Sequence, residues 1–269
     1  MPGLIYGTAW KKERTEELVV KAVQAGFRGV DTACQPKHYH EAGVGSAILA
    51  LQEGGIPRSS LFLQTKFTPL SGQDPQGIPY DARAPLAAQV AQSFEVSLKN
   101  LQTSHVDSWV LHSPLSNHSQ TMEAWKAMEQ IHESGKVFQL GISNCYSLET
   151  FRKLYQEARV KPAVLQNRFY ADTGYDAELR SWCQERGVVY QSFWTLTANP
   201  HILSSPEIRT LASKHHKTAP QIFFRALTHM GIVPLTGTCS EGHMKEDLGI
   251  FHFELSQDEV LEVRRLLTD

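Results

Sequence analysis

Two hydrophobic patterns alternate along the chain. Short, nearly continuous apolar runs are typical of buried strands, and longer segments with an apolar residue every three or four positions are typical of amphipathic helices. Strands are predicted over residues 4–6, 27–30, 61–65, 106–111, 137–142, 163–165, 188–193 and 232–235. Helices are predicted over residues 15–25, 41–51, 85–101, 121–132, 148–155, 178–186, 223–230 and from 256 onward. Because a helix follows each strand, the pattern favours an α/β fold of the (β/α)8 TIM barrel type, with an open doubly wound sheet as the alternative.

Local signals mark several element ends. Thr218 with Gln221, and Ser256 with Glu259, have the spacing of a capping box, in which each side chain bonds the backbone amide of the other residue. Residues 194–206 are predicted to form a loop, and residues 69–82 form the longest segment rich in Pro and Gly. A loop of the latter length inside a compact domain is usually functional.

Length and composition fit one barrel domain over residues 1–269, because such barrels use about 250 residues. The net charge of −2 shows no bias toward nucleic acid or an anionic membrane. The sequence shows no signal peptide and no run near the ~20 apolar residues of a membrane span, which predicts a cytoplasmic protein. The four cysteines lie far apart without a CxxC pair and are expected to be reduced thiols.

Polar residues follow three of the predicted strands directly. Asp31 closes the second, Lys66 the third and His112 the fourth, while Tyr39 lies in the same loop as Asp31. The carboxyl ends of barrel strands share one mouth, where barrel enzymes keep their chemistry. Each residue alone has a structural explanation, but four of them at consecutive strand ends predict an active site.

The four side chains suit protonation of a carbonyl oxygen. A free tyrosine has a pKa of about 10, and a neighbouring ammonium favours its phenolate form. We expect Lys66, held by Asp31, to lower the pKa of Tyr39, and His112 to hydrogen-bond the reacting oxygen. Since no side chain donates hydride, a reduced nicotinamide would have to bind in the same mouth. No GxGxxG motif opens any predicted helix, so the usual dinucleotide fingerprint is absent.

The sequence resembles the aldo-keto reductase family over nearly its whole length. The similar segments, in order, are GTAW, DTACQPKHYHEAGVGSAI, QTKF, VDSWVLHSP, GKVFQLGISN and FELSQDE. The resemblance implies a (β/α)8 barrel that binds NADPH across its mouth and reduces aldehydes or ketones. By position, it also implies that Asp31, Tyr39, Lys66 and His112 form the catalytic tetrad.

The resemblance further implies a cofactor site, in which Ser143, Asn144 and Gln166 hold the nicotinamide carboxamide. The full set expected to contact cofactor is Gly7, Thr8, Asp31, Ser143, Asn144, Gln166, Gln191, Ser192, Phe193, Trp194, Leu196, Thr236, Gly237, Thr238, His243, Glu246 and Asp247. The substrate is expected to be a small carbonyl compound. Its expected contacts are Trp10, Tyr39, Phe67, His112, Trp194 and the loop over residues 69–82.

The sequence departs from the family pattern at several places. The insert CQPKH precedes Tyr39, and Gln191 stands where the family stacks an aromatic ring on the nicotinamide, with Phe193 and Trp194 just beyond it. Leu235 and His243 replace the lysine and arginine that grip the 2′-phosphate of the cofactor.

Possible phosphate donors remain in Thr236, Thr238, His243 and Lys245. The expected cofactor is therefore NADPH, with NADH as the alternative. The family's leading hairpin and longer C-terminal tail are missing from this sequence, which predicts a more open pocket.

Two other functions are open to this sequence. His38 and His40 alternate near Lys66 and His112 and could serve a metal-dependent barrel hydrolase, although the expected site has no metal. A nicotinamide-sensing interaction subunit with little turnover is the second alternative. The main prediction is a monomeric NADPH-dependent carbonyl reductase with no nucleic-acid or membrane partner.

Overall fold

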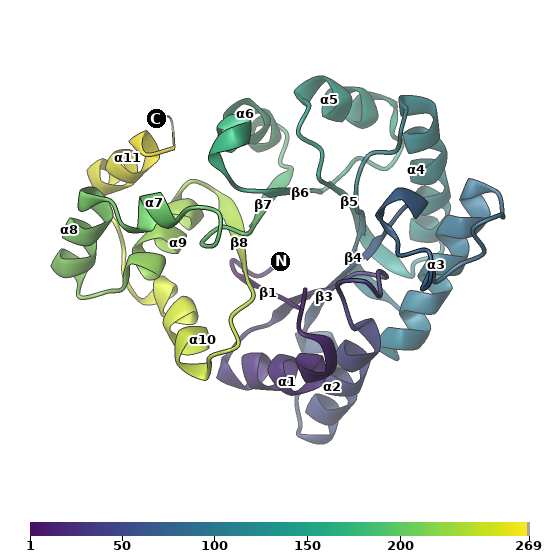
Figure 1. The fold of residues 1–269 in the computed structure, drawn as a ribbon, viewed down its shortest axis with the longest axis horizontal. Coiled ribbons are helices and arrows are strands. Elements are labelled where there is room, and N and C mark those ends of the chain that lie inside the picture. Colours follow the sequence, from purple (N-terminus) through teal and green to yellow (C-terminus); the bar gives the residue numbers. More distant parts are fainter. Residues whose placement is uncertain (268–269) are drawn as a thin grey trace.

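The eight predicted strands form one closed parallel barrel in a computed structural model that describes residues 1–267. The strands follow one another around the barrel in chain order, and the last pairs with the first. Figure 1 shows the helices arranged outside the ring of strands. This topology confirms the (β/α)8 barrel and makes the open doubly wound sheet wrong, because an open sheet would leave two unpaired edges.

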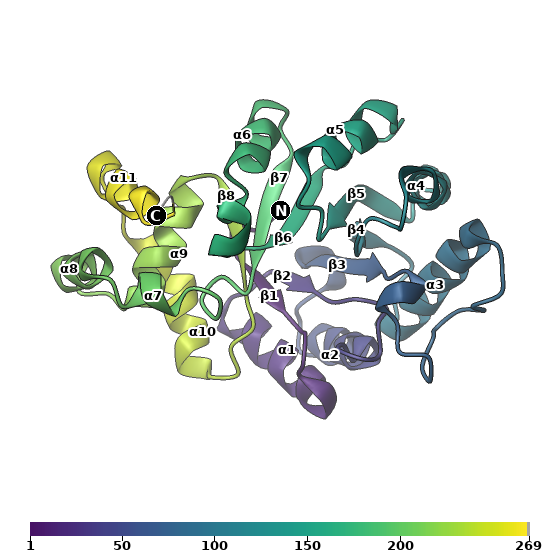
Figure 2. The ribbon, with the colours of Figure 1, turned by 45° about the horizontal axis from the view of Figure 1, so that its top comes forward.

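The barrel strands are short and their bounds agree closely with the apolar runs. They are β1 (Ile5–Gly7), β2 (Gly29–Asp31), β3 (Phe62–Phe67), β4 (Val106–Leu111), β5 (Val137–Ser143), β6 (Val164–Arg168), β7 (Val189–Phe193) and β8 (Ile232–Thr236). Figure 2, a tilted view, shows these strands running side by side within the surrounding helices.

The α-helices of the described chain are α1 (Thr15–Ala25), α2 (Glu41–Glu53), α3 (Leu86–Leu101), α4 (His118–Glu133), α5 (Leu148–Glu157), α6 (Ala177–Glu185), α7 (Pro200–Leu203), α8 (Pro206–His215), α9 (Ala219–His229), α10 (Glu241–Leu248) and α11 (Gln257–Arg265). Short 3-10 helices are η1 (Lys12–Arg14), η2 (Arg58–Ser60), η3 (Leu70–Gly72), η4 (Ala171–Asp176) and η5 (Gly249–His252). Both predicted capping boxes are present, at the starts of α9 and α11.

The hydrophobic pattern missed three α-helices, which are α7, α8 and α10; of these, α8 begins at Pro206 after the N-cap Ser205. The segment over residues 194–206, predicted as a loop, contains α7, a single turn that begins at Pro200. The pattern also gave no helix at α10, which buries only Met244 and Asp247 and so has almost no apolar stripe. The N-cap Ser240, whose side chain accepts from the His243 amide, was the available signal for α10.

The barrel interior is polar, whereas the apolar core lies between strands and helices. Three fully buried glutamines, Gln64, Gln166 and Gln191, face one another across the barrel. Gln64 and Gln166 donate through Nε2 to Gln191 Oε1 at 2.7 and 2.8 Å and to Asp31 Oδ1 at 2.8 and 3.0 Å. These bonds give both amide nitrogens and the Gln191 oxygen a partner, as buried polar groups require. They also tie β3, β6 and β7 to the carboxylate of β2.

The chain start lies near the barrel axis, where Figure 1 marks the N-terminus. Met1 Sδ accepts a hydrogen bond from Gln191 Nε2 at 3.4 Å. Among residues 1–267, no helix combines the length and apolar character that crossing a membrane requires.

Candidate active site

A large cavity opens at the carboxyl ends of the strands. Its volume is about 1060 Å³, at the upper end of the roughly 300–1,000 Å³ usual for ligand sites. Residues at or just beyond the ends of all eight strands line it. The predicted mouth is therefore a real hollow, hereafter the cavity, and it gathers side chains that lie far apart in the sequence.

Asp31 and Lys66 form a buried ion pair beneath the cavity. Lys66 Nζ lies 2.6 Å from Asp31 Oδ2 and also donates to the Thr32 carbonyl at 2.8 Å. The two side chains are only 1% and 3% exposed, Lys66 and Asp31 respectively. Burial lowers the pKa of Lys66, and the Asp31 carboxylate opposes that change. A buried pair with further hydrogen bonds holds both charges in fixed places.

Tyr39 lines the cavity beside this pair. Lys66 Nζ lies 5.2 Å from the centroid of the Tyr39 ring, and the Tyr39 and His112 rings are 6.1 Å apart. Burial, and then the Asp31 carboxylate, raise the pKa of Tyr39 above its ordinary value. The expectation that Lys66 lowers this pKa is therefore wrong for the structure described. Asp31 lies so close to the ammonium that it cancels most of the positive field at the phenol, and desolvation then dominates.

His112 lines the cavity as a neutral imidazole. Burial, and then the charge of Lys66, lower its pKa to about 3. Its Nδ1 lies 2.6 Å from Thr68 Oγ1, and no residue within 1–267 hydrogen-bonds its Nε2. If the Thr68 hydroxyl donates to Nδ1, then Nε2 carries the proton and can donate it to a ligand oxygen.

Ser143, Asn144 and Gln166 come together on the adjoining strand ends. Ser143 Oγ donates to the Gln166 carbonyl at 2.7 Å, and Asn144 Nδ2 donates to the His112 carbonyl at 2.9 Å. Asn144 adopts a left-handed backbone with φ of 50°, which asparagine tolerates better than most residues. Gln166 Oε1 has no partner among residues 1–267 and stays available as an acceptor. The three therefore present amide and hydroxyl groups to one part of the cavity.

Gln191 and Phe193 lie on the same side of β7 but in different layers of the barrel. Gln191 pairs in register with Gln166 and points into the barrel, where it is fully buried. Phe193 pairs with Arg168 two residues later, on the same side but one layer nearer the cavity, which it lines. The expectation that Gln191 contacts the cofactor thus fails, because Gln191 lies one layer too deep. Phe193 is the aromatic residue of β7 that lines the cavity.

Three other expected contacts also lie outside the lining. Ser192 is fully buried and accepts from the Thr195 hydroxyl at 2.9 Å. Thr8 is buried and donates to the Asp31 carbonyl at 2.9 Å. Phe67 was expected to touch substrate but is fully buried, with its ring 5.7 Å from that of Tyr80. Alternation along β3 directs Lys66 inward and therefore Phe67 outward.

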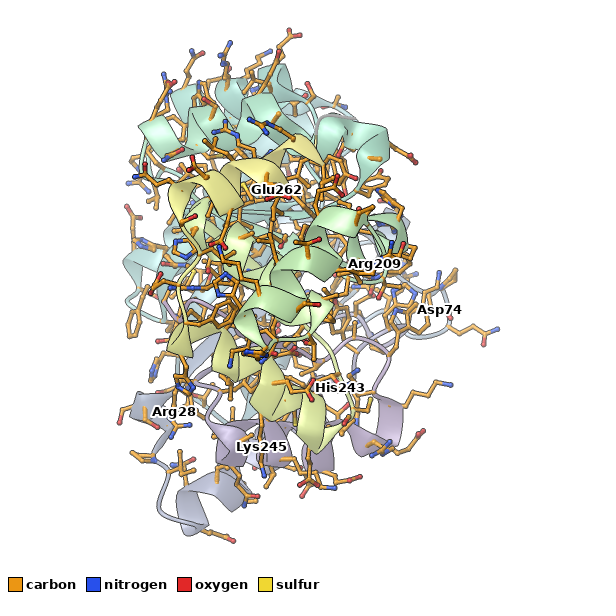
Figure 3. All side chains as sticks on the ribbon, turned by 90° about the vertical axis from the view of Figure 1, so that its left-hand side faces the viewer. Arg28, Asp74, Arg209, His243, Lys245 and Glu262 are labelled. Carbon is orange, nitrogen blue, oxygen red and sulfur yellow. The ribbon has the colours of Figure 1, made fainter. Side chains whose placement is uncertain are left out.

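The remaining expected residues line the cavity. On the β7 and β8 sides these are Phe193, Trp194, Leu196, Thr236, Gly237, Thr238, His243, Glu246 and Asp247, and elsewhere Gly7, Trp10, Asp31, Tyr39, His112, Ser143, Asn144 and Gln166. Thr236 donates to Asp247 Oδ2 at 2.7 Å, and burial raises the pKa of Asp247 to about 6. Lys245, considered as a phosphate donor, shares α10 with His243, as Figure 3 shows. Lys245 does not line the cavity.

The sequence analysis missed two cations at the cavity. Lys11 reaches from the loop after β1 to the loop after β8, where its Nζ donates to the Gly237 carbonyl. Arg168 ends β6, two residues after Gln166. The period of two along a strand was the signal available for Arg168, because it places Arg168 on the same side as Gln166.

The two alternating histidines do not gather metal ligands. The His38 ring lies 4.1 Å from the Trp10 ring, and His40 precedes α2. Within residues 1–267, no group of three or more His, Cys, Asp and Glu side chains is placed to hold a metal ion. The hydrolase alternative is therefore not favoured.

Comparison with known proteins agrees with this barrel. The Aldo/keto reductase family matches residues 4–200. Glyoxal reductase of Bacillus subtilis (strain 168) is 29% identical, and the match covers 94% of this chain and 83% of that protein. The NADPH-dependent alpha-keto amide reductase of Saccharomyces cerevisiae is 28% identical, over 97% of this chain and 84% of that protein.

Among solved structures, an aldo-keto reductase from a Medee basin deep-sea metagenome library superposes with a TM-score of 0.84. It is 25% identical and covers 99% of this chain and 91% of that chain. The fold and the cavity thus define an oxidoreductase barrel. The chain belongs to the aldo-keto reductase family.

Proposed function

We propose that the protein reduces an aldehyde or ketone to an alcohol with NADPH, and that Tyr39 donates the proton. The observation that carries this proposal is the shared cavity of a neutral Tyr39, a neutral His112 and the buried Asp31–Lys66 pair. The names of the two relatives support a small carbonyl substrate.

The residues present fit a nicotinamide cofactor. Gln166 Oε1, the Ser143 hydroxyl and the Asn144 amide offer the acceptors and donors that a carboxamide needs, and the Phe193 ring offers a flat apolar surface beside them. The cavity volume suits a large ligand together with a small one. When bound, a reduced nicotinamide supplies the hydride that no side chain can provide.

The residues near β8 bear on which nicotinamide cofactor is preferred. Thr236, Thr238 and His243 offer donors for the extra phosphate of NADPH, and Lys11 lies nearby. Leu235 offers none, and Glu246 and Asp247 are acidic. We favour NADPH, as in the yeast relative, and keep NADH as the alternative to be distinguished by direct affinity measurement with each cofactor.

The protein's own groups then move one proton. At neutral pH the raised pKa of Tyr39 keeps its phenol protonated, so the proton is present for the carbonyl oxygen. His112 Nε2 is free to hydrogen-bond that oxygen and fix its direction. Donation leaves a phenolate, and the ammonium 5.2 Å from the ring stabilises that charge only once it has formed. The ion pair therefore acts on the developing charge rather than on the resting acid.

Replacing Tyr39 with phenylalanine tests the proposal. Tyr39→Phe removes the acid but keeps the ring, so we expect turnover with small aldehydes to fall about 10²–10⁴-fold. Cofactor affinity, followed by NADPH fluorescence, should change less than twofold. Tyr155→Phe is the matched control, since Tyr155 packs on Trp182 outside the cavity. Full turnover in Tyr39→Phe would overturn the role of Tyr39.

The alternatives predict other results. A nicotinamide-sensing subunit would bind NADPH without turning over any aldehyde, ketone or quinone.

We also propose that the protein is a monomer and works in the cytosol. Light scattering of the purified protein tests the monomer, and fractionation of cells that express the chain tests the location.

A further inference from the structure

Arg168 is a cation at the cavity for which residues 1–267 provide no anionic partner. It ends β6, is half-buried and lines the cavity. Its guanidinium carbon lies 4.2 Å from the ring centroid of Trp194 and 5.3 Å from that of Tyr170. Within residues 1–267 no carboxylate pairs with it, and its Nε is buried without a hydrogen-bond partner.

The other half-buried or buried arginines within residues 1–267 each have an acceptor on the guanidinium, although Arg58 Nε, like Arg168 Nε, is buried without a partner. Arg58 pairs with Asp107 at 2.7 Å, Arg180 donates to the Tyr175 carbonyl at 2.7 Å, and Arg225 donates to the Phe253 carbonyl at 2.8 Å. Lys66, the charged nitrogen within the tetrad, pairs with Asp31. Partly removing a guanidinium from water without giving it an acceptor is unfavourable, so such a group points to a ligand.

The geometry leaves the outer edge of Arg168 open. Of its side-chain nitrogens only Nε is fully covered, and neither Nη atom has a partner within residues 1–267. Trp194 adopts a left-handed backbone with φ of 57°, which is unfavourable for a non-glycine residue, and in this conformation its ring lies over the guanidinium. The rings of Trp194 and Tyr170 thus hold the cation in place through cation–π contact.

Arg168 also lies in the layer next to the chemistry. Alternation along β6 puts it on the side of Gln166, one layer nearer the opening, and it pairs in register with Phe193. Gln166 Nε2 reaches Asp31 Oδ1 at 3.0 Å, so β6 faces the tetrad across the cavity. Tyr39 and Arg168 line the same cavity, so a ligand within it can contact both residues.

We propose that Arg168 determines substrate specificity by binding a carboxylate on the carbonyl substrate. The preferred substrates are then aldehydes or ketones that also bear a carboxylate. This inference rests on the proposed function. A guanidinium with free Nη groups matches a carboxylate through two parallel hydrogen bonds, which an uncharged ester cannot accept with comparable strength.

A matched pair of aldehydes tests whether Arg168 binds a substrate carboxylate. 4-Formylbenzoate carries the carboxylate, and its methyl ester has the same ring and aldehyde without charge. We expect the wild type to prefer the acid, and Arg168→Gln to lower kcat/KM for the acid about 10–100-fold, mainly through KM. The same variant should change kcat/KM for the ester less than threefold. For Arg168→Lys, kcat/KM for the acid should lie between the values for the wild type and Arg168→Gln. The control variant Arg152→Gln changes an exposed residue on α5 and should have the kcat/KM values of the wild type.

Two further measurements separate the outcomes. Calorimetry of 4-formylbenzoate binding, without reduced cofactor, should show affinity lost in Arg168→Gln, and this readout does not depend on turnover. If the wild type binds the acid but reduces neither aldehyde, the proposed function fails and the inference about the anion site stands. If Arg168→Gln lowers kcat/KM equally for the acid and the ester, or weakens NADPH binding, Arg168 has another role and the inference is overturned.

Discussion

Two cations, Lys66 beneath the cavity and Arg168 in its lining, differ in burial and in their charged partners. Lys66 on β3 is almost completely buried and has a carboxylate 2.6 Å away. Arg168 on β6 is half-buried, lies against two aromatic rings and has no carboxylate within the described chain. The difference teaches that a charge satisfied inside the protein can act on chemistry without binding a ligand, whereas an unsatisfied one serves recognition.

Breaking the buried pair should have the largest effect. Lys66→Met leaves Asp31 charged and unpaired in the barrel, which should cost about 3–5 kcal/mol of stability and lower turnover by about 10³-fold or more. Urea unfolding and steady-state kinetics measure the two losses. In the double variant Asp31→Asn with Lys66→Met the stability should largely return while turnover stays low. If Lys66→Met unfolds like the wild type, the pair does not hold the charges as described.

Asp247 is intermediate between the paired Lys66 and the unpaired Arg168. Its carboxylate accepts a hydrogen bond from the Thr236 hydroxyl but has no cationic partner within the described residues. Burial raises its pKa from an ordinary 3.8 to about 6, so the folded protein binds this proton more tightly than the unfolded chain. The favourable contribution of protonated Asp247 to the free energy of unfolding is fully present below pH 3.8. It is lost as the pH rises to about 6. At 1.36 kcal/mol per pKa unit, the loss is roughly 3 kcal/mol at most.

Asp247→Asn should remove this dependence. The amide keeps a partner for Thr236 but carries no charge, so the variant should gain up to roughly 3 kcal/mol relative to the wild type between pH 4 and 7. Urea unfolding of the cofactor-free protein across that range makes the comparison. A constant difference between the two proteins at every pH would contradict the assigned titration.

Giving Arg168 an internal partner should have the smallest effect. The Tyr170 ring lies 5.3 Å from the guanidinium, so Tyr170→Glu brings a carboxylate within reach. We expect this glutamate to compete with the ligand and reduce the preference for 4-formylbenzoate over its methyl ester about tenfold. Tyr170→Gln is the neutral control and should keep the preference. An unchanged preference in Tyr170→Glu would mean that Arg168 does not meet the carboxylate.

The sequence by itself determined the barrel and much of the cavity lining. Eight apolar runs, each followed by a helical pattern, were enough, because strand and helix periods are local properties. Asp31, Lys66 and His112 could be placed at the cavity for the same reason, since each follows a strand in a fold that puts all carboxyl ends at one mouth.

Only the tertiary structure decided the depth and electrostatics of these residues. Gln191 and Phe193 differ by one layer, and that depends on the stagger between neighbouring strands rather than on either residue's type. The direction of the Tyr39 pKa depends on distances to Asp31 and Lys66, which come from different strands. The lack of a carboxylate beside Arg168 within the described residues likewise depends on segments that are distant from it in the sequence. The burial and the ion pairing of a residue depend on all the residues packed around it, and most of these are distant in the sequence. A local sequence pattern therefore does not predict them.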